Sequence, residues 1–259
     1  MRARISTIAS NTFREAVRDR VLYNLIVFAV MIVGAALVLG QITVDIQRLF
    51  LINMGLSAIS IFGVVIAIFI GIGLVSKEID KKTLYTILSR PVRRWEFIIG
   101  KFVGLNTTLL VNTAVMAAAL FVALLPVSYY RWHLGDAELL VAIYFIMLQF
   151  MMMISLALLF SSFSSPILSA VFSFALFIVG SFAQDLRLMA ASSHGAVQWM
   201  VKGVSYLVPN LASLNVITSV SHGQAVAGAV IVHNTLYAVL YSAAVVAGAV
   251  LIFERRNLK

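Results

Sequence analysis

Residues 76–101, SKEIDKKTLYTILSRPVRRWEFIIGK, decide the fold because they form a long charged break inside an otherwise apolar chain. Seven of the 19 Lys and Arg residues lie in this stretch, and the segments on either side are each long enough to cross a bilayer. An ion at the centre of a bilayer costs about 2.5–3.5 kcal/mol on insertion scales. Charges gathered between long apolar segments are therefore typical of a protein that crosses a membrane several times.

The overall composition supports a membrane protein. Hydrophobic residues make up 62% of the chain and charged residues 11%, whereas about a quarter of the residues in a soluble domain are charged. The net charge of +9 comes from basic residues that flank apolar segments, which favours anionic lipid and a cytoplasmic protein partner over nucleic acid. The absence of cysteine excludes disulfides, thiolate metal sites and cysteine nucleophiles.

Six segments have the length and composition of transmembrane helices. A helix rises about 1.5 Å per residue, so roughly twenty apolar residues cross a hydrocarbon core of about 30 Å. We expect spans at residues 21–40, 51–75, 102–126, 137–160, 166–183 and 228–253. The serine-rich residues 161–165 predict a tight hairpin, with Pro166 in the first turn of the next helix. The predicted fold is an all-α polytopic membrane protein with one domain, residues 1–259.

The distribution of basic residues predicts the orientation. Six spans place both termini on the side that also holds residues 76–101, and this side carries 15 of the 19 Lys and Arg residues. The other side carries four: Arg48, Arg131, Arg187 and Lys202. The positive-inside rule then places the N- and C-termini of a multi-pass protein in the cytoplasm.

Two further segments are expected at the membrane surface. Residues 1–20 predict an interfacial elbow helix, because apolar residues recur at helical spacing at Ile5, Ile8, Ala9, Thr12, Phe13, Ala16 and Val17. Residues 184–227 predict an extracytoplasmic helical segment whose last part, about 210–223, dips into the outer leaflet. Headgroup contacts are expected at the cytoplasmic surface for Arg14, Arg18, Trp95, Arg255 and Arg256.

The charged stretch itself predicts a short amphipathic helix outside the membrane. Ser76 is suited to cap its N-terminus, with Glu78 and Asp80 in the first turn, where carboxylates favour the helix dipole. Arg90 precedes Pro91 and marks the expected end. Taken alone, this basic loop could serve only topology and lipid attraction.

The same residues resemble the permease subunits of ABC-2 type transporters. In that family the loop between the second and third spans reads approximately Glu, a Gly-Thr or related pair, leucines, a proline, basic residues and Gly-Lys. The matching positions here are Glu78, Thr83, Leu84, Leu88, Pro91, Arg94, Gly100 and Lys101, and Lys82 replaces the usual glycine. The stretches NTFREAVRDRVLY and YLVPNLASLN are similar to the branch that includes the permease of the nitrous oxide reductase maturation system.

This resemblance implies an exporter subunit in the plasma (inner) membrane of a bacterium or archaeon, without an ATPase site of its own. A separate ABC ATP-binding subunit would hold ATP and Mg, this chain would bind no cofactor, and a second permease chain would complete a homodimer. The coupling helix and its flanks would contact the ATPase through Glu78, Lys82, Thr83, Leu84, Ile87, Leu88, Arg90, Pro91, Arg94, Gly100 and Lys101. Gly100-Lys101 lacks the upstream glycine and the following Ser or Thr of a phosphate-binding loop.

Several alternatives remain open from the residues. An ion-coupled secondary transporter has the same span count, although no predicted span holds a central charge. A non-transporting scaffold is compatible with the same pattern, and a membrane enzyme would need a catalytic constellation that the sequence does not show. Asn106, Asn112 and Gln149 either line a path or bond neighbouring helices. Methionines 147, 151, 152 and 153 are either core residues or soft metal ligands.

Overall fold

The computed structural model describes residues 2–18, 47–80, 93–127, 136–192 and 208–255, and a few single positions between 23 and 38 and between 199 and 203. Every regular element in these ranges is helical. The elements are α1 (Arg2–Val17), α3 (Gln47–Asp80), α5 (Arg94–Val127), α6 (Asp136–Phe163), α7 (Pro166–Ser181), α8 (Ala183–Ser192), the 3₁₀ turn η1 (Ala212–Leu214), α10 (Ile217–Ser221) and α11 (Gly228–Arg255).

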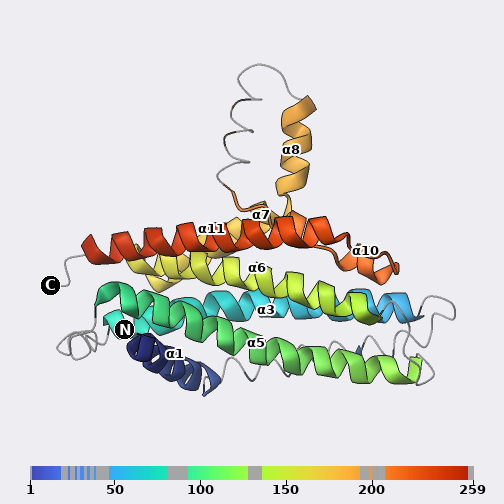
Figure 1. Ribbon diagram of the computed structural model, residues 1–259, viewed down its shortest axis with the longest axis horizontal. Coiled ribbons are helices and arrows are strands. Elements are labelled where there is room, and N and C mark those ends of the chain that lie inside the picture. The colour runs from blue at the N-terminus through green and yellow to red at the C-terminus, as the bar shows by residue number, and fades with distance from the viewer. Residues whose placement is uncertain are drawn as a thin grey trace.

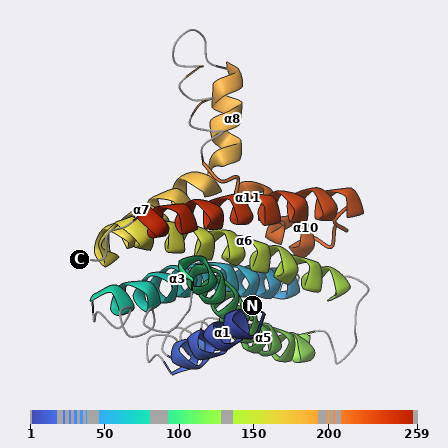
Figure 2. The same ribbon diagram turned by 60° about the vertical axis from the view of Figure 1, so that its left-hand side comes forward.

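The long helices lie side by side in one bundle, with α6 at its centre (Figure 1). Helix α6 packs against α3, α5, α7 and α11, and its residues Phe145, Phe150 and Ile154 are completely buried. Met152 and Met153 are also fully buried in this core, and Met147 and Met151 pack against it. Helix α1 lies along α5 at one edge, whereas α8 stands away from the bundle (Figure 2).

The helices agree with most of the predicted spans. Four are long and apolar enough to cross a membrane: Gln47–Gly73, Arg94–Leu125, Ala137–Phe163 and Gly228–Arg255. Helices α7 and α8 count as one further span if taken together, with a bend of 57° between them. The predicted span at residues 21–40 lies almost entirely outside the described residues. The described part of the chain thus provides four or five of the six predicted spans.

The predicted start of the short charged helix at Ser76 is wrong. Helix α3 continues without a break through residues 76–80, so Ser76 is an interior residue of α3 and does not cap a new helix. Neither Gly nor Pro occurs between residues 74 and 80, so the usual signals for α3 to end before Asp80 are missing. Helix α5 begins at Arg94, eight residues before the predicted third span. The link between α3 and α5 is therefore shorter than predicted.

The predicted hairpin between α6 and α7 is confirmed. Helix α6 ends at Phe163, and Pro166 begins α7 after two intervening serines. The Ser165 hydroxyl accepts a hydrogen bond from the backbone N–H of Leu168 at 3.5 Å, with extended backbone at Ser165. A serine cap accepts a bond from a backbone N–H that has no partner within the helix, and proline at the first helical position has no N–H that needs one.

Helix α1 buries the residues that the sequence pattern selects, but it buries them against protein. Thr12 and Ala16 are buried, and the other five residues of the apolar stripe are partly buried. Arg4, Arg14 and Arg18 are exposed. The partner of the stripe is α5, with a smaller contact to α3. A position of α1 at the headgroups stays a prediction.

Candidate functional site

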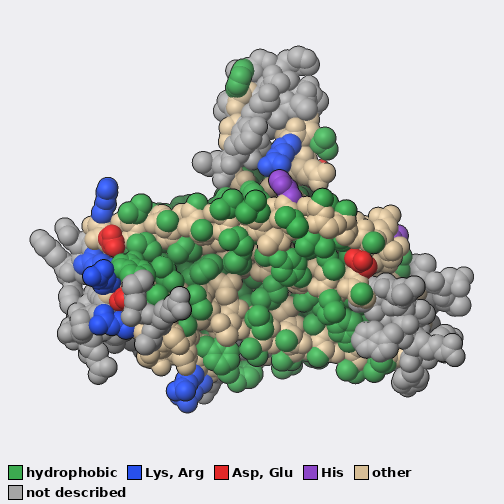
Figure 3. Space-filling model, in the orientation of Figure 1, with side chains coloured by type: hydrophobic (Ala, Val, Ile, Leu, Met, Phe, Trp, Pro, Cys, Tyr) green, Lys and Arg blue, Asp and Glu red, His purple; other side chains and the backbone are tan. Residues whose placement is uncertain are grey.

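Charged side chains gather at the end of the bundle where α5 begins and α11 ends (Figure 3). We define the charged junction as α1, residues 93–104 at the start of α5, and residues 253–255 at the end of α11. Two ionisable residues in it are almost completely buried: Glu96 and Lys101 are each 2% exposed. A buried charge is costly unless it is paired, so the partners of these two residues determine the geometry of the junction.

Glu96 fixes the beginning of α5. It is the third residue of the helix, and its Oε2 accepts a hydrogen bond from the backbone N–H of Arg93 at 3.0 Å. This contact satisfies a donor at the helix start, and a carboxylate in the first turn also favours the helix dipole. Arg4 of α1 places its guanidinium Nη1 3.9 Å from the same oxygen. The carboxylate of Glu96 therefore joins α1 to the first turn of α5.

Lys101 makes a second ionic contact with α1. Its Nζ lies 3.7 Å from Oε2 of Glu15, whose side chain is 46% exposed. The same Nζ lies 5.6 Å from the centre of the Phe97 ring, a distance at which a cation and an aromatic face attract each other. Lys101 is thus held between a carboxylate of α1 and an aromatic ring of its own helix.

Arg94 joins the start of α5 to the end of α11. Its Nη1 donates to the backbone carbonyl oxygens of Phe253 at 3.1 Å and Glu254 at 3.0 Å. The last carbonyls of a helix lack partners within that helix, so a guanidinium is a favourable cap for them. The buried rings of Phe97 and Phe253 stack below this contact at 5.8 Å between centroids. These contacts attach the last turn of α11 to α5.

Two glycines allow α1 to approach α5 closely. A Cβ on Gly100 would lie 2.6 Å from the Ile8 side chain, and a Cβ on Gly104 would lie 2.6 Å from the backbone oxygen of Ala9. Small residues four positions apart form such a groove on many membrane helices. The Gly100-x-x-x-Gly104 pattern therefore serves packing between two helices of the same chain.

Together these contacts make three elements into one unit. Helix α5 extends from the junction for 34 residues through the bundle, so a displacement of its first turn reaches α6 and α3 directly. The described residues contain no group of three or more His, Cys, Asp or Glu side chains placed to hold a metal ion. The contacts of the junction attach α1 and the end of α11 to the same end of α5.

A comparison with protein-family models identifies the chain: residues 6–258 match the ABC-2 family transporter protein model. The chain belongs to the ABC-2 transporter family. It is accordingly a multi-pass membrane protein of the permease type, and the family implies an ABC transporter with an ATPase partner. A comparison with curated proteins found no match.

The structure places part of the predicted coupling set of this ABC-2 permease. Arg94, Gly100 and Lys101 come together in the charged junction, where Gly100 and Lys101 face α1. Glu78 lies in the last turns of α3. The remaining members lie outside the described residues: Lys82, Thr83, Leu84, Ile87, Leu88, Arg90 and Pro91.

The predicted headgroup residues of the ABC-2 permease lie around the same junction. Arg14, Arg18 and Arg255 are exposed, Trp95 is partly buried beside Arg94, and Arg256 lies outside the described residues. Sequence analysis missed Glu96 and Glu15, the two carboxylates that hold the junction together. A signal was present, because each is an acidic residue within a strongly basic segment.

Proposed function

We propose that this permease is the membrane subunit of an ABC exporter in a bacterial or archaeal plasma membrane. The charged junction faces the cytoplasm, and the link between α3 and α5 contacts a separate ATPase subunit that holds ATP and Mg. The observation that carries the proposal is the pair of ionic contacts Arg4–Glu96 and Lys101–Glu15, each between a buried residue near the start of α5 and a half-exposed residue of α1. They attach α1 to the helix that an ATPase would move.

The lengths of the two helices that flank the link support this mechanism. Helix α3 ends at Asp80 and α5 begins at Arg94, so the link is bounded on each side by a helix of 34 residues. A helix is stiff along its axis, so movement of the link would tilt or translate both helices together. Subunit motions of this kind are a common way to open and close a path.

The uneven burial of the spans supports a second permease chain. In the most apolar 18-residue stretch of α3, 72% is buried, whereas the corresponding value for α11 is 28%. Large apolar side chains remain exposed along α11, including Val232, Leu236 and Leu240. Lipid or a second copy would cover this face, and two copies would enclose the path between them.

Co-purification with a candidate ABC ATP-binding subunit from the same organism tests the proposal. Glu78→Arg reverses a charge at the end of α3, and Asp185→Arg makes the matched reversal on exposed Asp185 of α8. We expect the first variant to insert in the membrane but to retain less than about a tenth of the bound ATPase, and the second to retain all of it. Equal retention by both variants would contradict the proposed coupling surface.

A further inference from the structure

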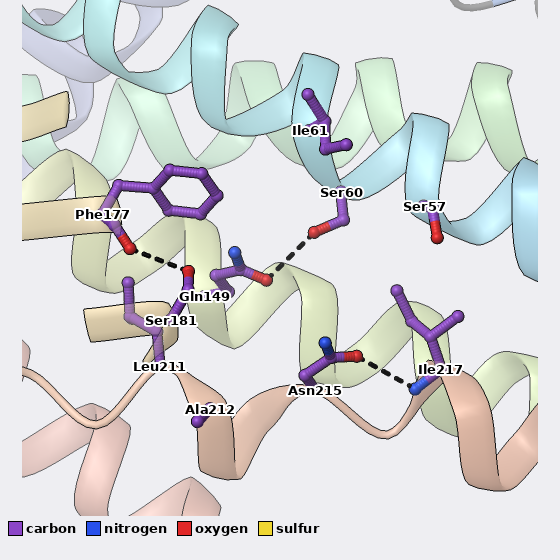
Figure 4. Close-up of a pocket in the computed structure, with 10 residues that line it drawn as sticks. All are labelled: Ser57, Ser60, Ile61, Gln149, Phe177, Ser181, Leu211, Ala212, Asn215 and Ile217. Carbon is purple, nitrogen blue, oxygen red and sulfur yellow. Dashed lines mark hydrogen bonds between the residues drawn. The ribbon is translucent and has the colours of Figure 1, made fainter. Parts of the chain in front are cut away.

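A cavity of about 170 Å³ lies between α3, α6, α7 and residues 208–221 (Figure 4). We call residues 208–221 the inserted segment; it contains η1 and α10. Polar side chains line the cavity from four elements: Ser57 and Ser60 from α3, Gln149 from α6, Ser181 from α7 and Asn215 from the inserted segment. The Ser181 hydroxyl donates to the Phe177 carbonyl of its own helix at 2.8 Å. Ile61 and Phe177 form part of its apolar wall.

The cavity lies about midway along two candidate membrane spans. Ser60 follows Gln47 by 13 residues, and Gln149 follows Ala137 by 12, which places both about 18–20 Å along their helices. Irregular backbone at such a depth is tolerated where it is enclosed by protein or lines a cavity. The inserted segment lines the cavity, and its residues Leu211, Leu214 and Ile217 are buried against the bundle.

The inserted segment is fastened to three helices, so the cavity has a fixed wall. The Leu211 N–H donates to the Gly180 carbonyl of α7 at 3.1 Å, and the Asn210 N–H donates to the Tyr237 hydroxyl of α11 at 2.8 Å. Asn234 Nδ2 donates to the Ser213 carbonyl at 3.0 Å, and Asn53 Nδ2 of α3 donates to the Ser221 hydroxyl at 3.4 Å. These four contacts preorganise the site before any ligand binds.

The polar groups of the cavity are only partly satisfied. Ser60 donates from its hydroxyl to Gln149 Oε1 at 3.2 Å, and both residues are more than nine-tenths buried. Asn215 Oδ1 accepts from the Ile217 N–H at 3.3 Å. Within the described chain, the Ser57 hydroxyl and the amide nitrogens of Gln149 and Asn215 have no hydrogen-bond partner. The cavity therefore offers several N–H donors beside hydroxyl oxygens that accept.

The cavity reaches an apolar surface of the bundle. Ile61 lines it and is 53% exposed, and Ile178, which follows the lining residue Phe177, is 56% exposed. An apolar surface that adjoins a pocket of hydrogen-bonding groups suits a molecule with a polar head and a hydrocarbon tail. The described lining contains no Lys, Arg, Asp or Glu, so no ion pair is available for a charged head.

We propose that this cavity binds the uncharged, hydroxyl-bearing head of a membrane amphiphile whose tail lies along Ile61. Its volume equals that of about six water molecules at roughly 30 Å³ each, which fits a head the size of glycerol. Hydroxyls both donate and accept, so one such head satisfies the amides of Gln149 and Asn215 as well as the hydroxyl of Ser57. The site goes beyond the proposed function, and its occupancy requires neither ATP nor the ATPase.

Photoaffinity labelling of the full chain in lipid nanodiscs tests this site. The probe is a monoacylglycerol with a diazirine in its acyl chain, and the comparison probe is the matching acyl phosphate monoester, which carries a charged head. We expect the neutral probe to label peptides around residues 57–61 and 177–181, and excess unlabelled monoacylglycerol to reduce this labelling at least fivefold. The anionic probe should label these peptides at least fivefold less.

Three variants separate the site from general lipid contact. Ser57→Phe fills the cavity and should reduce labelling at least fivefold, and Gln149→Leu removes the central amide and should reduce it about threefold. Thr107→Val is the control, because Thr107 is exposed on α5 and bonds its own helix at Val103. Thermal unfolding of each variant establishes that it is folded.

Several results would overturn the proposal. Labelling spread evenly over exposed apolar residues would mean annular lipid only, and equal labelling by both probes would mean that the head is not recognised. Unchanged labelling in folded Ser57→Phe would exclude the cavity, which would then hold water only. None of these results bears on ATPase coupling, so failure here is distinct from failure of the proposed function.

Discussion

The charged junction and the inserted segment both hold helices of the bundle together, but they do so with different chemical groups. The junction attaches α1 to α5 and attaches the end of α11 to the start of α5. The inserted segment is attached to α3, α7 and α11. The junction uses ionic groups: Glu96 and Lys101 are paired with Arg4 and Glu15 of α1. The inserted segment uses neutral amides, hydroxyls and backbone groups. The difference follows from depth, because an ion far from water is much more costly than an amide.

This difference in chemical groups suits the charged junction and the inserted segment to different roles. Ionic contacts with nearby water can be long, at 3.7 and 3.9 Å, and still hold two helices together in several directions. Neutral hydrogen bonds at depth are shorter and directional, which fixes the shape of the cavity beside them. The first region is suited to transmit movement, and the second is suited to hold a ligand.

The largest expected loss of stability comes from a substitution in the groove formed by Gly100 and Gly104. In Gly104→Ala the new Cβ meets the Ala9 backbone oxygen, which cannot move aside as a side chain end can, so we expect a loss of about 1–3 kcal/mol in the free energy of unfolding. Thermal or denaturant unfolding of the purified protein measures it. Gly248→Ala is the matched control, because its Cβ would make an ordinary contact at 3.6 Å with Leu159. Equal stability of the two variants would contradict the close α1–α5 packing.

Removal of one ionic partner should have the next largest effect. Glu15→Gln leaves the charge of buried Lys101 with weaker compensation, and we expect a loss of about 1–2 kcal/mol, less than for a fully buried pair because Glu15 is half exposed. Arg14→Gln on the exposed face of α1 is the control and should change stability by less than about 0.5 kcal/mol. The difference in unfolding free energy between Glu15→Gln and Arg14→Gln should shrink at high salt. A difference that grows with salt would contradict the ionic contact between Glu15 and Lys101.

A smaller effect is expected at the inserted segment. Asn234→Leu removes the donor to the Ser213 carbonyl and should cost about 1 kcal/mol in unfolding free energy. Because no ion takes part, this loss should be the same at low and high salt. Parallel unfolding curves of Glu15→Gln and Asn234→Leu at two salt concentrations therefore test the contrast directly. A salt-dependent loss in Asn234→Leu would show that the two regions do not differ as described.

The sequence predicted the helices better than it predicted their partners. Helical spacing selected all seven stripe residues of α1, because periodicity identifies which face is buried. It did not reveal that α5 covers the face, since lipid and a neighbouring helix are equally apolar. The Gly100-x-x-x-Gly104 pattern indicates a close approach of some helix to α5, but it does not say which one. The structure shows that α1 fills the groove.

The polar residues within the spans illustrate the same limit. Asn106 bonds the Phe102 carbonyl of its own helix at 2.8 Å, whereas Gln149 crosses to Ser60 on α3. Nothing in the local sequence distinguishes these two amides, because the difference depends on a helix 89 residues away along the chain. The prediction of a helix start at Ser76 failed for a related reason. Serine is a good N-cap residue by itself, but α3 continues past Ser76.

The most direct test of the account is the side of the membrane on which the charged junction lies. The cysteine-free chain allows single-cysteine labelling, with Arg93→Cys at the exposed start of the junction and Gln224→Cys at the opposite end of the bundle. A membrane-impermeant maleimide should label Gln224→Cys in intact cells and Arg93→Cys only in inverted vesicles. Labelling of Arg93→Cys from outside intact cells would place the junction beyond the reach of a cytoplasmic ATPase and contradict the account.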